Sequence, residues 1–363
     1  MKVMFIVYHD LKTEARSQEI LECAKSIGDT VLVSYSKPFN DIKCKCIETG
    51  KGKRKYFQFI IAALKAIVKE RPEVVILHDN YTSVLIPYIR LFSKKTKVIY
   101  DSSELYIDKN RDKGLKSVKS EFLRLSEKKF INRADITIAA NIERARIMKT
   151  YFNLKADPIV FDNIHKIEDI YDINTCQEKY GHLFKDDVFN IVYGGGISKK
   201  RLTLELTKTV GDLGNEFSLI ILGNADKKDK EEFYTLLEDN NINNVTYIGF
   251  ISRAELRYML KNASISVSIF SQDTVNNINC ASGKLFESLF EGTPVLTSEN
   301  PPLKRVCIDY GVGISTNNFY DGIIKLRENY SYYCSNVNDY VRKIEFSNRV
   351  GNLSRALISE LKL

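Results

Sequence analysis

Short hydrophobic runs alternate with amphipathic stretches along the chain. In the first half the runs predict strands at Lys2–Tyr8, Thr30–Ser34, Val74–Leu77, Lys97–Tyr100 and Ile136–Ala139. The stretches between them predict helices at Glu14–Ser26, Tyr56–Glu70, Ser83–Phe92 and Ser117–Asn132. Strands this apolar, separated by helices, favour a parallel sheet that is covered on both faces.

The second half of the chain repeats this rhythm. Hydrophobic runs predict strands at Phe189–Tyr193, Ser218–Leu222, Val245–Ile248, Ile265–Ile269 and Pro294–Thr297. Amphipathic stretches predict helices at Leu202–Leu213, Lys228–Asn240, Arg253–Lys261, Gly283–Phe290 and Val337–Leu361. The segment Lys166–Asp187 is polar and lacks periodicity outside Tyr171–Tyr180, so we expect a linker there.

These patterns predict an α/β protein with two doubly wound, Rossmann-like domains that face each other across a cleft. A length of 363 residues suits two domains better than one. The expected division is an N-terminal domain (1–165), a linker (166–187), a C-terminal domain (188–335) and a helical tail (336–363) that packs back on the N-terminal domain. Ligands of such sheets bind beyond the carboxyl ends of the strands, so the residues after each strand carry the most information.

Charge is unevenly distributed. The formal net charge is +8, but residues 1–165 carry 31 Lys and Arg against 20 Asp and Glu, and the remainder carries 23 against 26. A basic first half attracts nucleic acid, acidic lipid or a phosphorylated substrate. Seven cysteines with irregular spacing argue against a disulfide framework and favour a reducing compartment. The hydrophobic runs are too short for a signal peptide or a membrane span, so we expect a cytoplasmic protein.

A glycine triplet, Gly194–Gly196, follows the strand that ends at Tyr193, and Lys199, Lys200 and Arg201 come next. Glycines let the backbone approach a phosphate, and the amides and cations at a helix start attract it. The sequence therefore predicts phosphate binding around Gly195, Gly196, Lys199 and Arg201, and a flexible turn with solvated lysines is the alternative. The spacing matches neither a Walker loop nor a strict G-x-G-x-x-G.

A second pattern runs from Ser282 to Val295. A helix that starts near Gly283 would offer its amides and Lys284 to an anion. Glu287 lies at i+3 from Lys284 on the same face, where a carboxylate can accept both ribose hydroxyls. The alternative is a surface Lys–Glu pair on a capped helix.

The segment Lys284–Val295 resembles the nucleotide-sugar signature of retaining GT-B glycosyltransferases, in particular the family-4-like group (glycosyl transferases group 1), with its K-L-x-E-x-x-x-x-G-x-P-V helix. Other segments agree with this family in order and spacing: Val245–Phe250 with Ala254–Leu256, Arg133–Ile136, and Ile159–Phe161 with Asn163. The resemblance covers nearly the whole chain and says nothing about which sugar is transferred.

The resemblance implies a retaining enzyme that moves a sugar from a nucleotide-sugar donor to a glycan acceptor, with UDP-sugar favoured and GDP-sugar the alternative. Glu287 would bind the donor ribose, and Arg201 the diphosphate. Lys284 and the amides near Ser282 and Gly283 would bind phosphate or sugar, and Ile248 and Phe250 would flank the base. Cations that stabilise the departing diphosphate would supply most of the catalysis, so Arg201 and Lys284 rank above any histidine.

Three loops after strands of the first half would face the acceptor. They contain Asp10 with Arg16, His78 with Asp79, and Asp101 with Ser103 and Glu104. The third loop resembles the family's D-x-H-E, with Ser103 in place of histidine. His78 and Asp79 therefore become the catalytic candidates. The alternative is a structural hydrogen bond between these two residues. Asp79 and Asp101 are separate and no Asp-x-Asp follows a strand, so we expect no metal and no cofactor beyond the donor.

The chain departs from the family pattern at three positions. Asn279 stands where the family often has a second acid, Gly196 stands near its usual arginine, and Ser103 replaces the loop histidine. These departures favour the alternative of a non-catalytic GT-B subunit that binds carbohydrate or stabilises a partner glycosyltransferase. A nucleic-acid binder and an NAD-dependent dehydrogenase rank low, because aromatic–basic interleaving and a glycine-rich first turn are lacking.

Basic clusters flank an apolar helix in the first half. Lys51–Lys55 precede Tyr56–Ile61, and Lys94, Lys95 and the segment Lys109–Lys119 follow later. They predict docking on an anionic membrane, as expected for an enzyme that elongates lipid-linked glycans in surface polysaccharide synthesis. The alternative is a helix that packs on its own sheet beneath solvated lysines.

Overall fold

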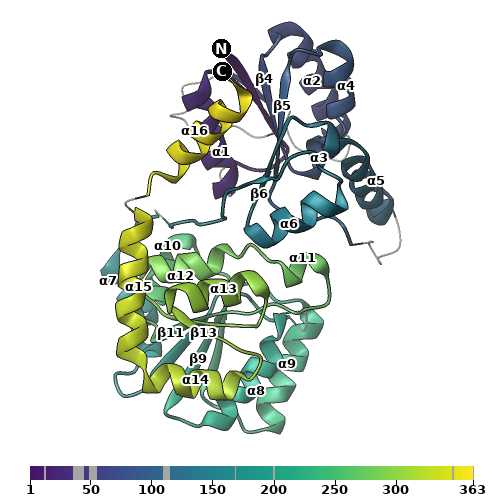
Figure 1. Cartoon of the computed structure of the whole chain (residues 1–363). Coiled ribbons are helices and arrows are strands. Elements are labelled where there is room, and N and C mark those ends of the chain that lie inside the picture. Colours follow the sequence, from purple (N-terminus) through teal and green to yellow (C-terminus); the bar gives the residue numbers. More distant parts are fainter. Residues whose placement is uncertain are drawn as a thin grey trace. The chain divides into compact units, whose positions relative to one another are not determined.

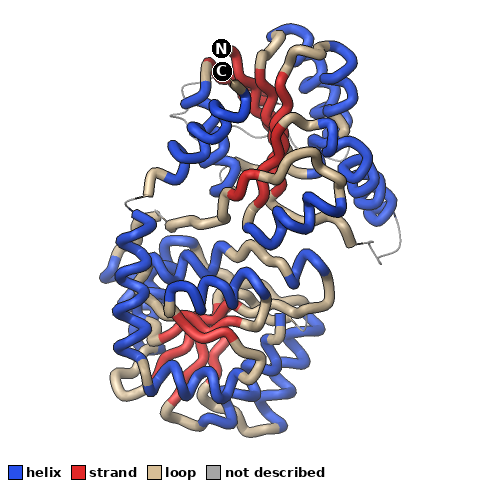
Figure 2. The backbone as a smooth tube through the Cα atoms, in the orientation of Figure 1, coloured by secondary structure: helices blue, strands red, loops and turns tan. Residues whose placement is uncertain are grey.

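The structure is a computed structural model that describes residues 1–11, 14–35, 45–48, 55–108, 115–167, 169–198, 201–345 and 347–362. The chain forms two compact units. Unit 1 comprises Met1–Asn163 and Asn348–Leu363, and unit 2 comprises Ile164–Ser347. Each unit contains one parallel sheet with helices on both faces (Figures 1 and 2), as the alternation of apolar and amphipathic segments predicts.

The sheet of unit 1 has the order β3-β2-β1-β4-β5-β6-β7. Its strands are β1 (Lys2–Val7), β2 (Asp29–Ser34), β3 (Lys45–Glu48), β4 (Val74–His78), β5 (Lys97–Ser102), β6 (Ile136–Ala139) and β7 (Ile159–Val160). Its helices are α1 (Ala15–Ile27), α2 (Lys55–Glu70), α3 (Asn80–Ser83), α4 (Ile86–Phe92), α5 (Leu115–Phe130), α6 (Ile142–Tyr151) and α16 (Arg349–Leu361), with a 3₁₀ turn at Ile131–Arg133.

Helices α1 and α16 pack on one face of this sheet, and α2, α4 and α5 lie on the other side (Figure 1). The core under α1 and α16 combines alternate strand residues such as Phe5 and Ile76 with Leu353, Leu357 and Leu361 of α16. Unit 1 therefore depends on residues from both ends of the chain.

The sheet of unit 2 has the order β10-β9-β8-β11-β12-β13. Its strands are β8 (Phe189–Tyr193), β9 (Phe217–Leu222), β10 (Val245–Gly249), β11 (Ile265–Ser268), β12 (Val295–Thr297) and β13 (Gly313–Ser315). Its helices are α7 (Ile173–Tyr180), α8 (Thr203–Leu213), α9 (Lys227–Asp239), α10 (Arg253–Asn262), α11 (Val275–Ile278), α12 (Gly283–Phe290), α13 (Pro301–Tyr310), α14 (Phe319–Glu328) and α15 (Tyr330–Glu345), with a 3₁₀ turn at Gly181–Leu183.

Two segments differ from the sequence-based expectation. Residues 166–187, expected as a linker, bury Ile167, Cys176 and Tyr180 in a hydrophobic cluster of unit 2, so they are part of that unit. The tail, expected as one helix, is two: α15 packs in unit 2, and α16 starts after Asn348, whose side chain accepts a hydrogen bond from the Gly351 amide.

Both sheets reverse their strand order next to their first strand. In unit 1 the reversal lies between β1 and β4, and in unit 2 between β8 and β11. A doubly wound sheet binds ligands at this point, beyond the carboxyl ends of its strands. Among the residues described, no helix has the length and the apolar composition needed to cross a bilayer.

Candidate functional site

The glycine turn after β8 lies at the reversal point of the unit 2 sheet. Gly196 has φ +70°, and a Cβ there would lie 2.0 Å from the carbonyl oxygen of Asn224. A Cβ on Gly195 would meet the Tyr193 ring at 2.0 Å. A side chain at either position would clash with its surroundings, so this tight turn requires glycine at both.

Arg201 is held beside this turn. Its Nη1 donates a hydrogen bond to the Gly195 carbonyl oxygen at 2.5 Å, and the residue is exposed. Lys199, the other predicted cation, lies outside the described residues. The structure thus brings Arg201 to the glycine turn, with guanidinium nitrogens left for an anion.

Lys284 is the second residue of α12, which lies between α11 and β12 in the chain. Its Nζ lies 6.0 Å from the ring centroid of Tyr193 and 5.9 Å from that of Phe270. Burial and the charge of Arg201 lower the pKa of Lys284 to about 8, against the opposing effect of Glu287. A phosphate bound beside this ammonium group would stabilise its charged form.

Glu287 lies one turn further along α12, with 12% of its side chain exposed. The Nη2 of Arg253 donates to its Oε1 at 3.3 Å. Burial raises the pKa of Glu287, and the charges of Arg253 and Lys284 oppose that rise. No local sequence pattern indicates Arg253, because this residue reaches Glu287 from the neighbouring helix α10.

The start of α12 presents backbone amides at the same point. Ser282 is the residue before the first turn, and its hydroxyl lies 2.9 Å from that of Ser268 instead of capping the helix. A Cβ on Gly283 would lie 3.5 Å from the His165 ring, so this position is not crowded. An anion can therefore bind the amides of α12 next to Lys284.

Three other residues of unit 2 belong to the predicted set or its departures. Ile248 is half-buried in β10. Phe250 follows that strand and is 76% exposed, so its ring is accessible to a ligand. Asn279 is buried and its side-chain amide donates to the Val275 carbonyl at 2.9 Å, so it helps to end α11.

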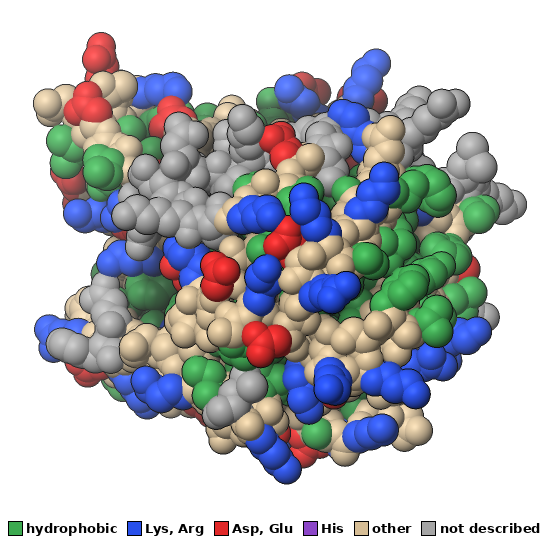
Figure 3. All heavy atoms as spheres, turned by 90° about the horizontal axis from the view of Figure 1, so that it is seen from above, with side chains coloured by type: hydrophobic (Ala, Val, Ile, Leu, Met, Phe, Trp, Pro, Cys, Tyr) green, Lys and Arg blue, Asp and Glu red, His purple; other side chains and the backbone are tan. Residues whose placement is uncertain are grey.

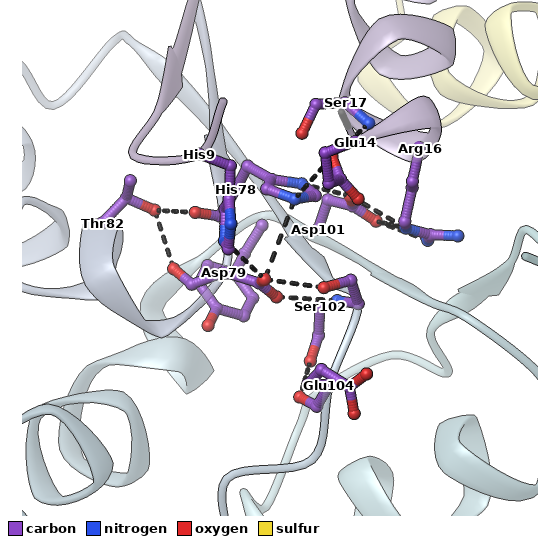
Figure 4. Close-up of polar contacts among 12 residues, drawn as sticks. His9, Glu14, Arg16, Ser17, His78, Asp79, Thr82, Asp101, Ser102 and Glu104 are labelled. Carbon is purple, nitrogen blue, oxygen red and sulfur yellow. Dashed lines mark hydrogen bonds and ion pairs between the residues drawn. The ribbon is translucent and has the colours of Figure 1, made fainter. Parts of the chain in front are cut away.

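The reversal point of unit 1 carries a compact polar network (Figure 4). His78 ends β4, and its Nδ1 lies 2.7 Å from Oδ2 of Asp101. Arg16 donates to both carboxylate oxygens of Asp101 and, through Nη1, to the Phe161 carbonyl. Arg16, His78 and Asp101 have no exposed surface, so they hold one another in place and do not reach solvent.

Asp79 is the next residue in the chain and has a φ of 58°, a backbone conformation that residues other than glycine rarely adopt. Its carboxylate accepts hydrogen bonds from the Ser103 amide at 2.8 Å and the Ser103 hydroxyl at 2.6 Å. Nε2 of His9, which lies in the loop after β1 and was not singled out from the sequence, is 3.1 Å from Asp79 Oδ2. Backbone strain of this kind is concentrated at functional sites.

Charges in this network shift its pKa values. Burial acts to lower the pKa of His78, but the carboxylates of Asp79, Asp101 and Glu14 raise it to about 9. Burial acts to raise the pKa of Asp79, and His78 and His9 lower it overall. The Asp79 carboxylate thus stays ionised and favours a positive charge on the His78 imidazole.

The remaining acceptor-side residues lie at the edge of this network. The Glu104 carboxylate is 44% exposed and pairs with Arg144 Nη2 at 3.0 Å. Arg144 also donates to the Ser103 carbonyl, which fixes the loop after β5. Asp10 is half-buried, and its carbonyl accepts a hydrogen bond from the Glu14 amide at 3.1 Å.

Comparison with solved structures identifies similar chains over the full length. Sucrose-phosphate synthase from Thermosynechococcus elongatus has a TM-score of 0.72 at 15% identity, with 99% of each chain covered. HepE from Anabaena, solved in complex with UDP-glucose, has a TM-score of 0.70 at 10% identity, with 100% of this chain and 99% of that chain covered. The lipopolysaccharide outer core galactosyltransferase WaaB has a TM-score of 0.64 at 13% identity, with 99% and 100% covered.

No protein-family model and no curated protein sequence matches this chain. The similar structures are GT-B glycosyltransferases, and the present chain shares their two parallel-sheet α/β units. The chain therefore has the GT-B fold. At these levels of sequence identity the comparison fixes the fold, and the activity must be argued from the residues.

Proposed function

We propose that this chain is a retaining glycosyltransferase that moves a sugar from a UDP-sugar, or alternatively a GDP-sugar, to a glycan acceptor. One observation carries the proposal: Arg201, Lys284 and Glu287 gather with the Gly194–Gly196 turn at the reversal point of the unit 2 sheet. The fold supports it, since HepE, which shares the fold, was solved with UDP-glucose.

Each residue has a defined task in this proposal. The glycine turn, the α12 amides, Lys284 and Arg201 bind the diphosphate and stabilise the charge that develops on it as the sugar departs. Glu287, oriented by Arg253, accepts hydrogen bonds from the ribose hydroxyls. Ile248 and Phe250 flank the base.

A thermal-shift screen tests donor binding. UDP or GDP should raise the melting temperature of the full chain, because a ligand that binds only the folded state stabilises it by mass action; NAD and CMP should not. Glu287→Ala should remove most of the gain from UDP. Glu231→Ala, which removes an exposed carboxylate of α9 that pairs with Lys227 at 3.8 Å, is the matched control and should keep it.

Stabilisation by NAD alone would refute the donor assignment. Hydrolysis of a UDP-sugar by the purified chain then separates an enzyme from a non-catalytic subunit. A chain that binds UDP and never cleaves the donor, with or without glycan acceptors, would be such a subunit.

We also propose that the acceptor is lipid-linked and that unit 1 docks on an anionic membrane. Helices α2, α4 and α5 expose large hydrophobic side chains: Phe57, Ile61, Val68, Tyr88, Leu91, Phe92, Val118, Phe122 and Leu125. Exposed lysines occur on or beside the same helices: Lys65, Lys69, Lys94, Lys95, Lys128 and Lys129. Figure 3 shows hydrophobic side chains gathered on one side, with Lys and Arg around them. Apolar surface ringed by cations suits a lipid surface with anionic headgroups.

Co-sedimentation with vesicles tests this docking. The full chain should bind vesicles that contain anionic lipid, and added salt should weaken the binding. Leu91→Asp should reduce it, whereas Ile170→Asp, at an even more exposed hydrophobic residue of unit 2, should not. Vesicle binding that changes neither with added salt nor with either substitution would contradict the proposal. Lys51–Arg54 and Lys109–Gly114, part of the predicted basic clusters, lie outside the described residues.

A further inference from the structure

Three metal-ligating side chains converge at the reversal point of the unit 1 sheet. One ring nitrogen each of His9 and His78 and one carboxylate oxygen of Asp79 all lie within 4.8 Å of one another. Strands β1 and β4 pair in parallel with Val7 opposite His78, so the loop with His9 lies beside Asp79. Spacings of this size allow one ion to reach all three atoms after small side-chain movements, because metal–ligand bonds to nitrogen and oxygen are about 2 Å long.

One nitrogen of this set is buried without a hydrogen bond. His78 Nε2 makes none to any described residue, although the side chain is fully buried. Carboxylate oxygens of Glu14 and Asp79 lie 3.7 Å and 3.8 Å from it, beyond hydrogen-bond distance. A buried polar atom left without a partner is costly, so its position toward Asp79 and Glu14 (Figure 4) points to a ligand that completes it.

The surrounding residues orient these groups as the outer shell of a metal site does. Asp101 fixes the other nitrogen of His78, Nδ1, at 2.7 Å, and Arg16 in turn holds Asp101. Ser103 holds the Asp79 carboxylate through its amide and its hydroxyl. A carboxylate–histidine pair behind the metal is a recurrent second-shell arrangement, because it sets the tautomer and the ring orientation.

Charge also favours a cation at this point. The carboxylates of Glu14, Asp79 and Asp101 lie around the two imidazoles, and Arg16 supplies one positive charge. The three carboxylates and Arg16 together carry two net negative charges in a largely buried place, and one divalent ion balances these charges.

We propose that His9, His78 and Asp79 bind one divalent transition-metal ion, best matched by zinc, with a coordination position open on the partly exposed side of His9. Two imidazoles and one carboxylate are a donor set that zinc accepts, with water or substrate in the remaining position. The His9 side chain is 28% exposed, which gives the ion an entry path. The three ligands all belong to unit 1, whereas the residues of the proposed donor site belong to unit 2.

Calorimetry on the full chain tests the proposal, with Zn²⁺ added after treatment with a chelator and with Co²⁺ as a spectroscopic probe. One ion should bind per chain, and Co²⁺ should show the absorption of a low-symmetry site with nitrogen ligands. His9→Gln should lower the affinity by more than about 100-fold, since even outer-shell partners contribute 10–100-fold. His182→Gln, an exposed histidine of unit 2, is the matched control and should bind like the wild type.

His9→Gln is the decisive variant because His9 is not part of the packed core. Circular dichroism and UDP stabilisation should stay unchanged in it, so a loss of metal binding cannot be attributed to misfolding. Failure of the wild type to bind either ion at micromolar concentration would overturn the proposal, and so would equal affinity in His9→Gln and His182→Gln. Neither result would affect the donor site.

Discussion

In the proposed donor site, the lowered pKa of Lys284 should make UDP binding depend on pH. In the free protein, burial and Arg201 bring this pKa to about 8. A bound diphosphate adds negative charge beside the ammonium group and raises the pKa again. Below pH 8 the group is charged in both states, so affinity does not change with it. Above pH 8 the free protein has lost the proton and must regain it, so affinity falls as pH rises.

The size of the effect follows from that value. Proton linkage with a free-protein pKa of about 8 makes UDP bind about tenfold more weakly at pH 9 than at pH 7. Binding should take up about half a proton at pH 8 and about nine-tenths of a proton at pH 9. Calorimetry in buffers of different ionisation enthalpy measures this uptake directly.

Lys284→Arg is the control, because a guanidinium group stays protonated throughout this range. The variant should bind UDP with the same affinity at pH 7 and pH 9. Any effect of pH on UDP itself is common to the variant and the wild type. Equal pH dependence in wild type and variant would refute the reasoning. A wild-type affinity that is flat across this range would do the same.

Two further predictions concern stability, and hydrogen exchange by mass spectrometry suits both because it reports on each unit separately in a chain without tryptophan. Gly196→Ala should destabilise unit 2 by more than the roughly 1–3 kcal/mol of backbone strain alone, since its Cβ would strike the Asn224 carbonyl. Gly214→Ala has a similar φ, +83°, with open space around the Cβ, so an equal cost for the two would contradict the steric argument. Asp101→Asn should destabilise unit 1 by about 3–5 kcal/mol because it leaves Arg16 buried without its counter-charge. Asp339→Asn breaks an exposed pair with Arg342 and should cost less than about 1 kcal/mol; a similar loss in both would contradict the burial argument.

The central strands and the edge strand β10 were predictable from sequence, and the edge strands β3, β7 and β13 were not. The predicted strands at Lys2–Tyr8 and Phe189–Tyr193 match β1 and β8 closely, because central strands are buried on both faces and read as apolar runs. Strand β3 has the sequence KCIE and is mostly exposed, so no apolar run marks it. Strands β7 and β13 are only two and three residues long, too short for any periodicity.

The same distinction between local and long-range signals applies to the sites. The glycine turn and the Lys284–Glu287 pair are each contained in a few consecutive residues, so local spacing together with the family resemblance indicated them. The grouping of His9 with Asp79 depends on parallel pairing between strands 70 residues apart, which no local pattern encodes. Arg253 was missed for the same reason, since it meets Glu287 only after α10 and α12 pack together.

Residues from the last helix complete the hydrophobic core of unit 1, and this sets an order for biosynthesis. Leu353, Leu357 and Leu361 are synthesised after the whole of unit 2, so the surface of α1 that they cover stays open until then. Unit 2 is continuous in sequence and can fold while α16 is still in the exit tunnel. Unit 1, whose strands are synthesised before unit 2, therefore completes its core after it, and deletion of α16 destabilises strands that lie more than 180 residues earlier in the chain.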